Sequence, residues 1–266
     1  MKRLIFTILL LAAYAPLAAQ LYHPGERLEY RVSYKAKMFP NTEVGTVEIV
    51  TAEESDADGR PLYRVEGTGR TLPTYRWFYN MLDTYRIWVD AEALRPVRFE
   101  SDLREGDYTF ESHYDYDWDS LRIDTRWRSR QRPFEHKRME LTPKSMDPVS
   151  LFFNLRSARA EEFTEGEPST LSMVLQDTIR DIRYRYLGRE TKKIRNMGRF
   201  ETLKFECELG TTEEYSFTDG TIFTIWISDD ENKIPLYIES PVKIGSIQAY
   251  ISDYKGLKYP LSSKIK

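Results

Sequence analysis

Alternation of apolar and polar side chains constrains the fold of this chain more than any other feature. Across residues 28–38, apolar or aromatic side chains hold the even positions, and charged or polar side chains hold the odd ones. Successive side chains of a strand point to opposite faces, so this pattern predicts a half-buried antiparallel strand. The same alternation predicts further strands around residues 47–49, 63–65, 85–89 and 97–99.

A long hairpin over residues 107–128 shows the pattern at its clearest. A turn at Asp119-Ser120 would place Asp117 opposite Arg122 and Glu111 opposite Arg128. Opposite charges across a strand pair contribute about 0.2–1 kcal/mol each, and less where they are exposed. We therefore expect the charged row to be the solvated face of a sheet.

The aspartates of this hairpin also resemble the opening of a calcium loop, with Asp115, Asp117 and Asp119 at alternate positions. Such a loop requires a glycine next and a glutamate at its twelfth position, where Ser120 and Arg126 stand. The strand interpretation explains the spacing without a metal, and we expect neither a metal site nor a cofactor.

The second half of the chain continues as strands. They are predicted at residues 171–175, 182–187, 199–209, 221–228, 234–239 and 242–254. In the last of these the apolar phase changes at Gly245, which suggests a bulge or sharp bend. Cys207, the single cysteine, shares a phase with Leu203 and Phe205, so we expect a buried thiol that serves packing.

Two apolar segments have helical spacing or turn character. Asp147-Pro148 is a strong start signal for a helix that continues through residues 149–156, and residues 73–82 form a second short turn or helix. The chain is thus predicted to be mainly β, a β-rich α+β fold. It would form one long, strongly curved antiparallel sheet or incomplete barrel, with two short helices packed against it.

The first nineteen residues have the order of a secretory signal peptide. Lys2 and Arg3 precede an apolar run that is too short to span a bilayer, and small residues follow at Leu17-Ala18-Ala19. We expect cleavage near Ala19/Gln20, no lipidation because no cysteine follows the cut, and one soluble periplasmic domain over residues 20–266.

Composition narrows the partners. The net charge of −3 gives the chain no excess of basic residues with which to bind nucleic acid. The chain has no second long apolar segment, so we do not expect it to span a membrane. A monomer is the default expectation.

Aromatic side chains make up 14% of the chain. Most should fill the core, but two groups could plug or line a ligand space inside a curved sheet. The candidate ligand-binding residues are Tyr75, Trp77, Phe78, Tyr79, Phe152 and Phe153.

Several segments resemble an exported bacterial family, of Bacteroidetes type, catalogued as domain of unknown function 3108. They are Gly25 to Tyr30, Asp147 to Leu155, Trp226 to Asp230, Pro235, and Val242 to Ser246. The resemblance implies an envelope location and a mostly antiparallel β fold, and it carries no established activity. A curved sheet with apolar helices inside also resembles periplasmic carriers that shelter lipoprotein acyl chains.

No catalytic motif stands out. The three histidines lack metal-ligand spacing, and no serine lies in a G-x-S-x-G elbow, so we name no catalytic residue. The leading hypothesis is therefore a non-catalytic binder or carrier of an apolar or amphiphilic envelope ligand. An envelope hydrolase acting on glycan or lipid is the alternative, and a structural or partner-binding envelope module is a third.

Overall fold

The computed structural model describes residues 22–36, 39–157, 159–209, 221–242 and 245–265. The predicted signal peptide lies outside these residues. The described part of the chain contains sixteen strands: β1 (Arg27–Ala36), β2 (Phe39–Ser55), β3 (Pro61–Thr71), β4 (Met81–Asp90), β5 (Pro96–Glu105), β6 (Tyr108–Asp117), β7 (Arg122–Ser129), β8 (Glu135–Glu140), β9 (Ser145–Met146), β10 (Pro168–Leu175), β11 (Thr178–Ile194), β12 (Gly198–Leu209), β13 (Thr221–Ser228), β14 (Pro235–Pro241), β15 (Ser246–Lys255) and β16 (Lys264–Ile265).

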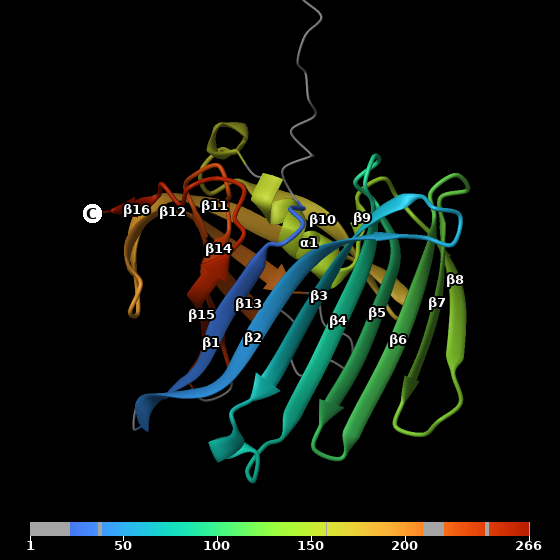
Figure 1. The fold of residues 1–266 in the computed structure, drawn as a ribbon, viewed down its shortest axis with the longest axis horizontal. Helices are drawn as coiled ribbons and strands as arrows, with labels where there is room; N and C mark the ends of the chain where they lie inside the picture. Colours follow the sequence, from blue (N-terminus) through green and yellow to red (C-terminus); the bar gives the residue numbers. More distant parts are fainter. Residues whose placement is uncertain (1–21, 37–38, 158, 210–220, 243–244, 266) are drawn as a thin grey trace, which may run out of the picture.

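All the strands join one curved, open sheet, as predicted (Figure 1). Its order is β8-β7-β6-β5-β4-β3-β2-β1-β15-β14-β13-β12-β11-β10-β9, with β16 paired to β12. Neighbouring strands are antiparallel except for β9 with β10. Because β1 to β8 are joined by successive hairpins, the β3–β4, β5–β6 and β7–β8 loops all lie at one end of the strands, which we call the hairpin end.

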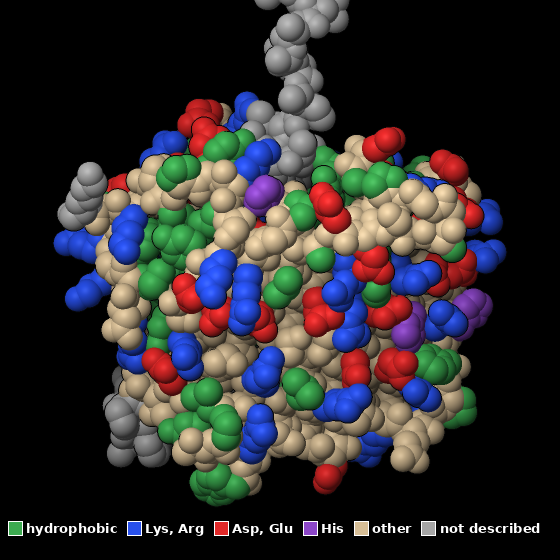
Figure 2. All heavy atoms as spheres, viewed as in Figure 1, with side chains coloured by type: hydrophobic (Ala, Val, Ile, Leu, Met, Phe, Trp, Pro, Cys, Tyr) green, Lys and Arg blue, Asp and Glu red, His purple; other side chains and the backbone are tan. Residues whose placement is uncertain are grey.

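The alternation separates an inner from an outer face. Val65, Ile87, Phe99 and Tyr114 lie side by side on four neighbouring strands, and each is almost fully buried. The predicted hairpin register is confirmed, because Asp117 pairs with Arg122 and Glu111 with Arg128 on the opposite, outer face. Figure 2 shows this outer face covered by intermixed acidic and basic side chains.

The helix α1 (Pro148–Asn154) packs on the inner face, away from the hairpin end (Figure 1). Its predicted cap is confirmed: the Asp147 carboxylate accepts hydrogen bonds from the backbone N–H groups of Val149 and Ser150. One-turn 3-10 segments follow at Leu155–Ser157 and Ala160–Glu162.

Two expectations are refined by the structure. The short turn predicted within residues 73–82 is present as a 3-10 turn at Pro73–Tyr75, but the chain then enters β4, so α1 is the one α-helix among the described residues. At Gly245 the sharp bend is confirmed and the bulge is not: the phase change marks the hairpin turn between β14 and β15, so residues 242–254 are not one strand, and the Gly245 φ of 91° suits glycine. The packing role of Cys207 is confirmed, since it lies in the core and burial raises its pKa to about 12.

The far ends of the sheet approach each other at a seam. There the β10–β11 turn meets β7 and β8. Thr125 Oγ1 donates to the Gln176 carbonyl oxygen at 2.6 Å, and Lys137 Nζ donates to that of Asp177 at 2.7 Å. Side chains therefore hold the seam, and the sheet order itself stays open between β8 and β9.

Candidate functional site

The helix α1 presents its two phenylalanines differently. Phe153 is fully buried and stacks on Tyr22, with ring centroids 4.7 Å apart. Phe152 packs edge-on to Phe153 against the same core but keeps part of its surface exposed. Phe153 thus anchors the helix, while Phe152 can contact a molecule held on the inner face.

A buried ion pair fixes the end of this helical segment. The Arg156 guanidinium donates to both carboxylate oxygens of Glu26, at 2.6 and 2.8 Å, and both side chains are nearly inaccessible to solvent. Arg156 also donates to the Asn232 carbonyl oxygen and lies over the Phe153 ring. The start of β1, the β13–β14 loop and α1 therefore meet at one guanidinium.

The inner wall between α1 and the hairpin end is thinly covered. Gly67 and Gly69 of β3 share the phase of the buried Val65 and so face inward. A methyl group added at Gly67 would meet only Ile49, at 4.0 Å, and one at Gly69 would touch Met81 and Val47 at ordinary distances. These two glycines leave a bare strip on the inner face.

Apolar side chains surround that strip and remain partly exposed. Ile49 and Tyr85 pair with Gly67 on either side, and Val47 pairs with Gly69. All three, like Met81, are partly rather than fully buried. We call Val47, Ile49, Gly67, Gly69 and Tyr85 the glycine strip. It can offer an apolar surface to a bound molecule.

Two carboxyl groups lie beside the strip at the hairpin end. Asp83 is buried on β4 and accepts from the Arg104 backbone N–H at 3.2 Å, while Glu105 accepts from the Tyr79 hydroxyl at 2.7 Å. Burial, together with the negative charge of Glu105, raises the pKa of Asp83 to about 7. The Asp83 carboxyl therefore keeps its proton to a higher pH than an exposed aspartate does.

The aromatic group of the β3–β4 loop points away from the inner face. Trp77 and Phe78 are 83% and 79% exposed, and their rings meet edge to face at the tip of the loop. Tyr79 is half exposed, and Tyr75 is partly buried at the base. The structure therefore does not bring these residues together with Phe152 and Phe153, which lie toward the other end of the strands.

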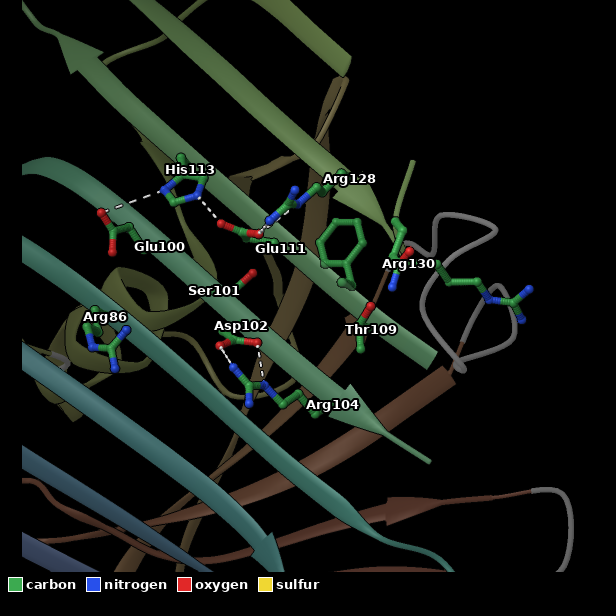
Figure 3. Close-up of a pocket in the computed structure, with 12 residues that line it drawn as sticks. Arg86, Glu100, Ser101, Asp102, Arg104, Thr109, Glu111, His113, Arg128 and Arg130 are labelled. Carbon is green, nitrogen blue, oxygen red and sulfur yellow. Dashed lines mark hydrogen bonds and ion pairs between the residues drawn. The ribbon is translucent and has the colours of Figure 1, made fainter. Parts of the chain in front are cut away.

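The outer face carries a charged hollow of about 600 Å³ over β4 to β7 (Figure 3). His113 lies between Glu100 and Glu111, and Arg128 donates to Glu111 at 2.6 Å. Glu100–His113 and Glu111–Arg128 are cross-strand pairs of the kind that stabilise an exposed sheet face, and His113–Glu111 lies within β6. Among the described residues, no group of three acidic, histidine or cysteine side chains could hold a metal ion, and no helix is long and apolar enough to cross a membrane.

The model of a family described as protein of unknown function, DUF3108, matches residues 29–252. The chain belongs to the DUF3108 family. No curated protein matches it in sequence.

Solved structures add likenesses to this DUF3108 chain. A β-barrel-like protein of domain of unknown function DUF1849 from Brucella abortus is 10% identical over 88% of this chain and 98% of its own, with a TM-score of 0.52. A protein described as exported, with a YmcC-like fold, from Bacteroides fragilis is 9% identical over 88% and 97%, with a TM-score of 0.34. The lipoprotein LppX of Mycobacterium tuberculosis is 8% identical over 91% and 96%, with a TM-score of 0.23. The first likeness shows the fold.

Sequence reasoning missed the features of the DUF3108 chain that depend on pairing across strands. Gly67 and Gly69 do alternate in phase with Val65, a signal that could have marked a bare inner strip. The Arg156–Glu26 pair joins residues 130 positions apart, and the Asp83–Glu105 pair depends on the β4–β5 register. No local pattern encodes either contact.

The raised pKa of Asp83 predicts a pH effect on stability. Between its ordinary value of 3.8 and about 7, the folded chain keeps a proton that the unfolded chain has lost. Raising the pH through this window therefore weakens folding. Asp83→Asn cannot ionise, so we expect it to be more stable than the parent at pH 8 and to lose that advantage near pH 4. Urea unfolding at both pH values measures this, and an equal difference at the two would contradict it.

Proposed function

We propose that this DUF3108 protein is a soluble periplasmic protein that binds an apolar or amphiphilic envelope molecule on the inner face of its sheet, without chemistry. The glycine strip carries the proposal. In a sheet core built only for packing, inward positions hold side chains that bury one another. Here two adjacent inward positions hold glycine, and the apolar neighbours Val47, Ile49 and Tyr85 stay partly exposed.

The ligand would lie along β3, with Phe152 at one end and Met81 at the other. Phe153 supports Phe152 from behind. Phe152 and Met81 at the ends of this path are apolar, and Asp83, which pairs with Gly69, places a carboxyl group at the hairpin end. Such a site suits a molecule with an apolar body and a polar head directed toward the hairpin end.

Gly67→Leu tests this site. The leucine side chain would occupy the space over the strip, so we expect binding of the apolar fluorescent probe N-phenyl-1-naphthylamine to weaken at least about tenfold, the loss of roughly 1.4 kcal/mol. Folding should be preserved, since glycine inside a strand costs about 0.5–1 kcal/mol relative to a residue with a side chain. Fluorescence titration and a urea unfolding curve measure the two effects.

The matched control is Thr68→Val, the next residue of β3, which faces outward and should leave probe binding unchanged. Equal probe affinity in Gly67→Leu, Thr68→Val and the parent would place the ligand elsewhere. Mass spectrometry of protein purified without detergent or delipidation supplies the second readout, a lipid present in the parent and depleted in Gly67→Leu.

The alternative of an envelope hydrolase draws on one observation, the carboxyl pair Asp83 and Glu105, where one group has a raised pKa. Asp83 and Glu105 lie diagonally across the β4–β5 pairing, on the same face. Tyr79 and the Arg104 backbone already engage both groups. These two carboxyl groups are therefore better explained as structural residues that hold the β3–β4 loop against β5.

A further inference from the structure

The two ends of the strands differ in chemistry. Among the large apolar side chains that the described residues expose most, seven lie at the hairpin end and two at the opposite end. Those at the hairpin end are Trp77, Phe78, Tyr79, Leu82, Phe134, Ile222 and Val242. Figure 2 shows apolar side chains protruding along this lower edge of the molecule.

Two loops at the hairpin end are locally basic. Two stretches at the hairpin end, residues 70–80 and 128–134, hold five arginines and no acidic residue. We call them the aromatic loops, because they also hold Trp77, Phe78 and Phe134. Arg70, Arg76, Arg130 and Arg132 are exposed, and none of them pairs with an acidic residue that the structure describes. The molecule as a whole is not divided by charge, since the β5–β6 turn at the hairpin end holds Glu105 and Asp107, and the opposite end holds the acidic turn at Asp56 to Asp58 as well as the basic residues 192–195.

The β3–β4 loop is held rigidly with its apolar tip outward. The backbone N–H groups of Phe78 and Tyr79 donate to the Tyr75 carbonyl oxygen, and the Gly106 N–H donates to that of Asn80 at 2.8 Å. The Tyr79 hydroxyl binds Glu105 at the base. Exposure of Trp77 and Phe78 is therefore built into the loop, so little ordering entropy remains to be lost on docking.

We infer that the aromatic loops dock the hairpin end onto the surface of an anionic phospholipid bilayer. Tryptophan, tyrosine and arginine together are the side chains that favour the membrane interface, where apolar rings enter the headgroup layer and cations meet lipid phosphates. A protruding tip suits insertion into a fluid layer, whereas a protein partner would be met by a broader apolar patch. The bilayer is thus the occupant that both shape and charge favour.

This inference stands apart from the proposed ligand site, although the two fit together. A bilayer at the hairpin end would face the end of the glycine strip where Met81, Asp83 and Glu105 lie. A lipid could then pass between membrane and inner face without crossing the charged outer face. Gly67→Leu should leave vesicle binding intact, so failure of one proposal is distinguishable from failure of the other.

The test is flotation of the exported, purified protein with vesicles of 70% phosphatidylcholine and 30% phosphatidylglycerol, compared with pure phosphatidylcholine. Trp77→Ser/Phe78→Ser should weaken binding to the mixed vesicles about 30-fold or more, the loss of two inserted rings. Arg76→Gln/Arg132→Gln should weaken it only where phosphatidylglycerol is present, and more at low salt than at high salt.

Leu121→Asn is the matched control, because it removes an exposed apolar side chain at the opposite end at a position with φ of 52°, which asparagine tolerates. Circular dichroism and the urea midpoint confirm that each variant is folded. Equal binding of the parent, the double serine variant and Leu121→Asn would overturn the inference. So would a parent that binds neither kind of vesicle, an outcome that would assign the aromatic loops to a protein partner.

Discussion

Glu26→Ala should destabilise the protein by about 3–5 kcal/mol, because it leaves the buried Arg156 guanidinium without a counter-charge. Arg156 has almost no contact with solvent and gives both of its terminal nitrogens to Glu26. The Asn232 carbonyl oxygen remains as a partner, but it carries no full charge. In a domain of this size each kcal/mol shifts the melting temperature by roughly 2–4 °C, so calorimetry should record a large drop.

The double variant Glu26→Leu/Arg156→Met separates two contributions to stability: the cost of leaving one buried charge unpaired, and the net stabilisation that the intact ion pair provides. Replacing a whole buried ion pair with apolar residues of similar volume is often neutral or stabilising. We expect the double variant to recover most of the stability that Glu26→Ala loses. A loss below about 1 kcal/mol in Glu26→Ala would show that water reaches Arg156 in solution.

Phe153→Ala should cost a similar amount, about 3–5 kcal/mol, through lost burial and the cavity left behind. The ring is fully buried, stacks on Tyr22 and lies under the Arg156 guanidinium. Its loss removes the fully buried part of the contact between α1 and the inner wall, where Val149 and Phe152 supply the rest. Urea unfolding measures the change, and an unaltered slope would show that the native state stays compact.

Phe152→Ala is the control for this prediction, since the two residues are neighbours with different exposure. We expect it to cost roughly 1 kcal/mol, because its side chain is only partly buried. It should weaken N-phenyl-1-naphthylamine binding several-fold, whereas folded Phe153→Ala should bind poorly only as far as α1 has shifted. Equal stability losses in the two variants would contradict their assigned roles.

The strands could be predicted because alternation is local. In β1 and β6 the polarity of each residue indicates which face of the sheet it occupies. The charge pairs Asp117–Arg122 and Glu111–Arg128 indicate the hairpin register. The edge strand β8 escaped prediction for the same reason. Its residues, Glu135 to Glu140, are nearly all exposed and so carry no apolar phase.

The candidate site was harder to predict because polarity does not say which side of a fold a side chain occupies. Trp77 and Phe78 have the composition of core residues, and only the hairpin geometry shows that they project from a loop tip. The same limit hides the glycine strip, where the informative property is the absence of a side chain next to Tyr85 and Ile49. Tertiary register decides both.

The seam between the two ends of the sheet has a mechanical consequence. Thr125 and Lys137 hold it by single hydrogen bonds to main-chain oxygens of the β10–β11 turn. Each such bond contributes only about 0.5–1.5 kcal/mol net, and breaking them leaves every strand pairing intact. The seam is therefore the one place among the described residues where the sheet can widen without losing a strand pairing, against only these hydrogen bonds and the apolar packing of Val174 and Ile179 with Ile123. We expect the ligand proposed for the inner face to be accommodated by widening at this seam, while the paired strands of the rest of the wall keep their register.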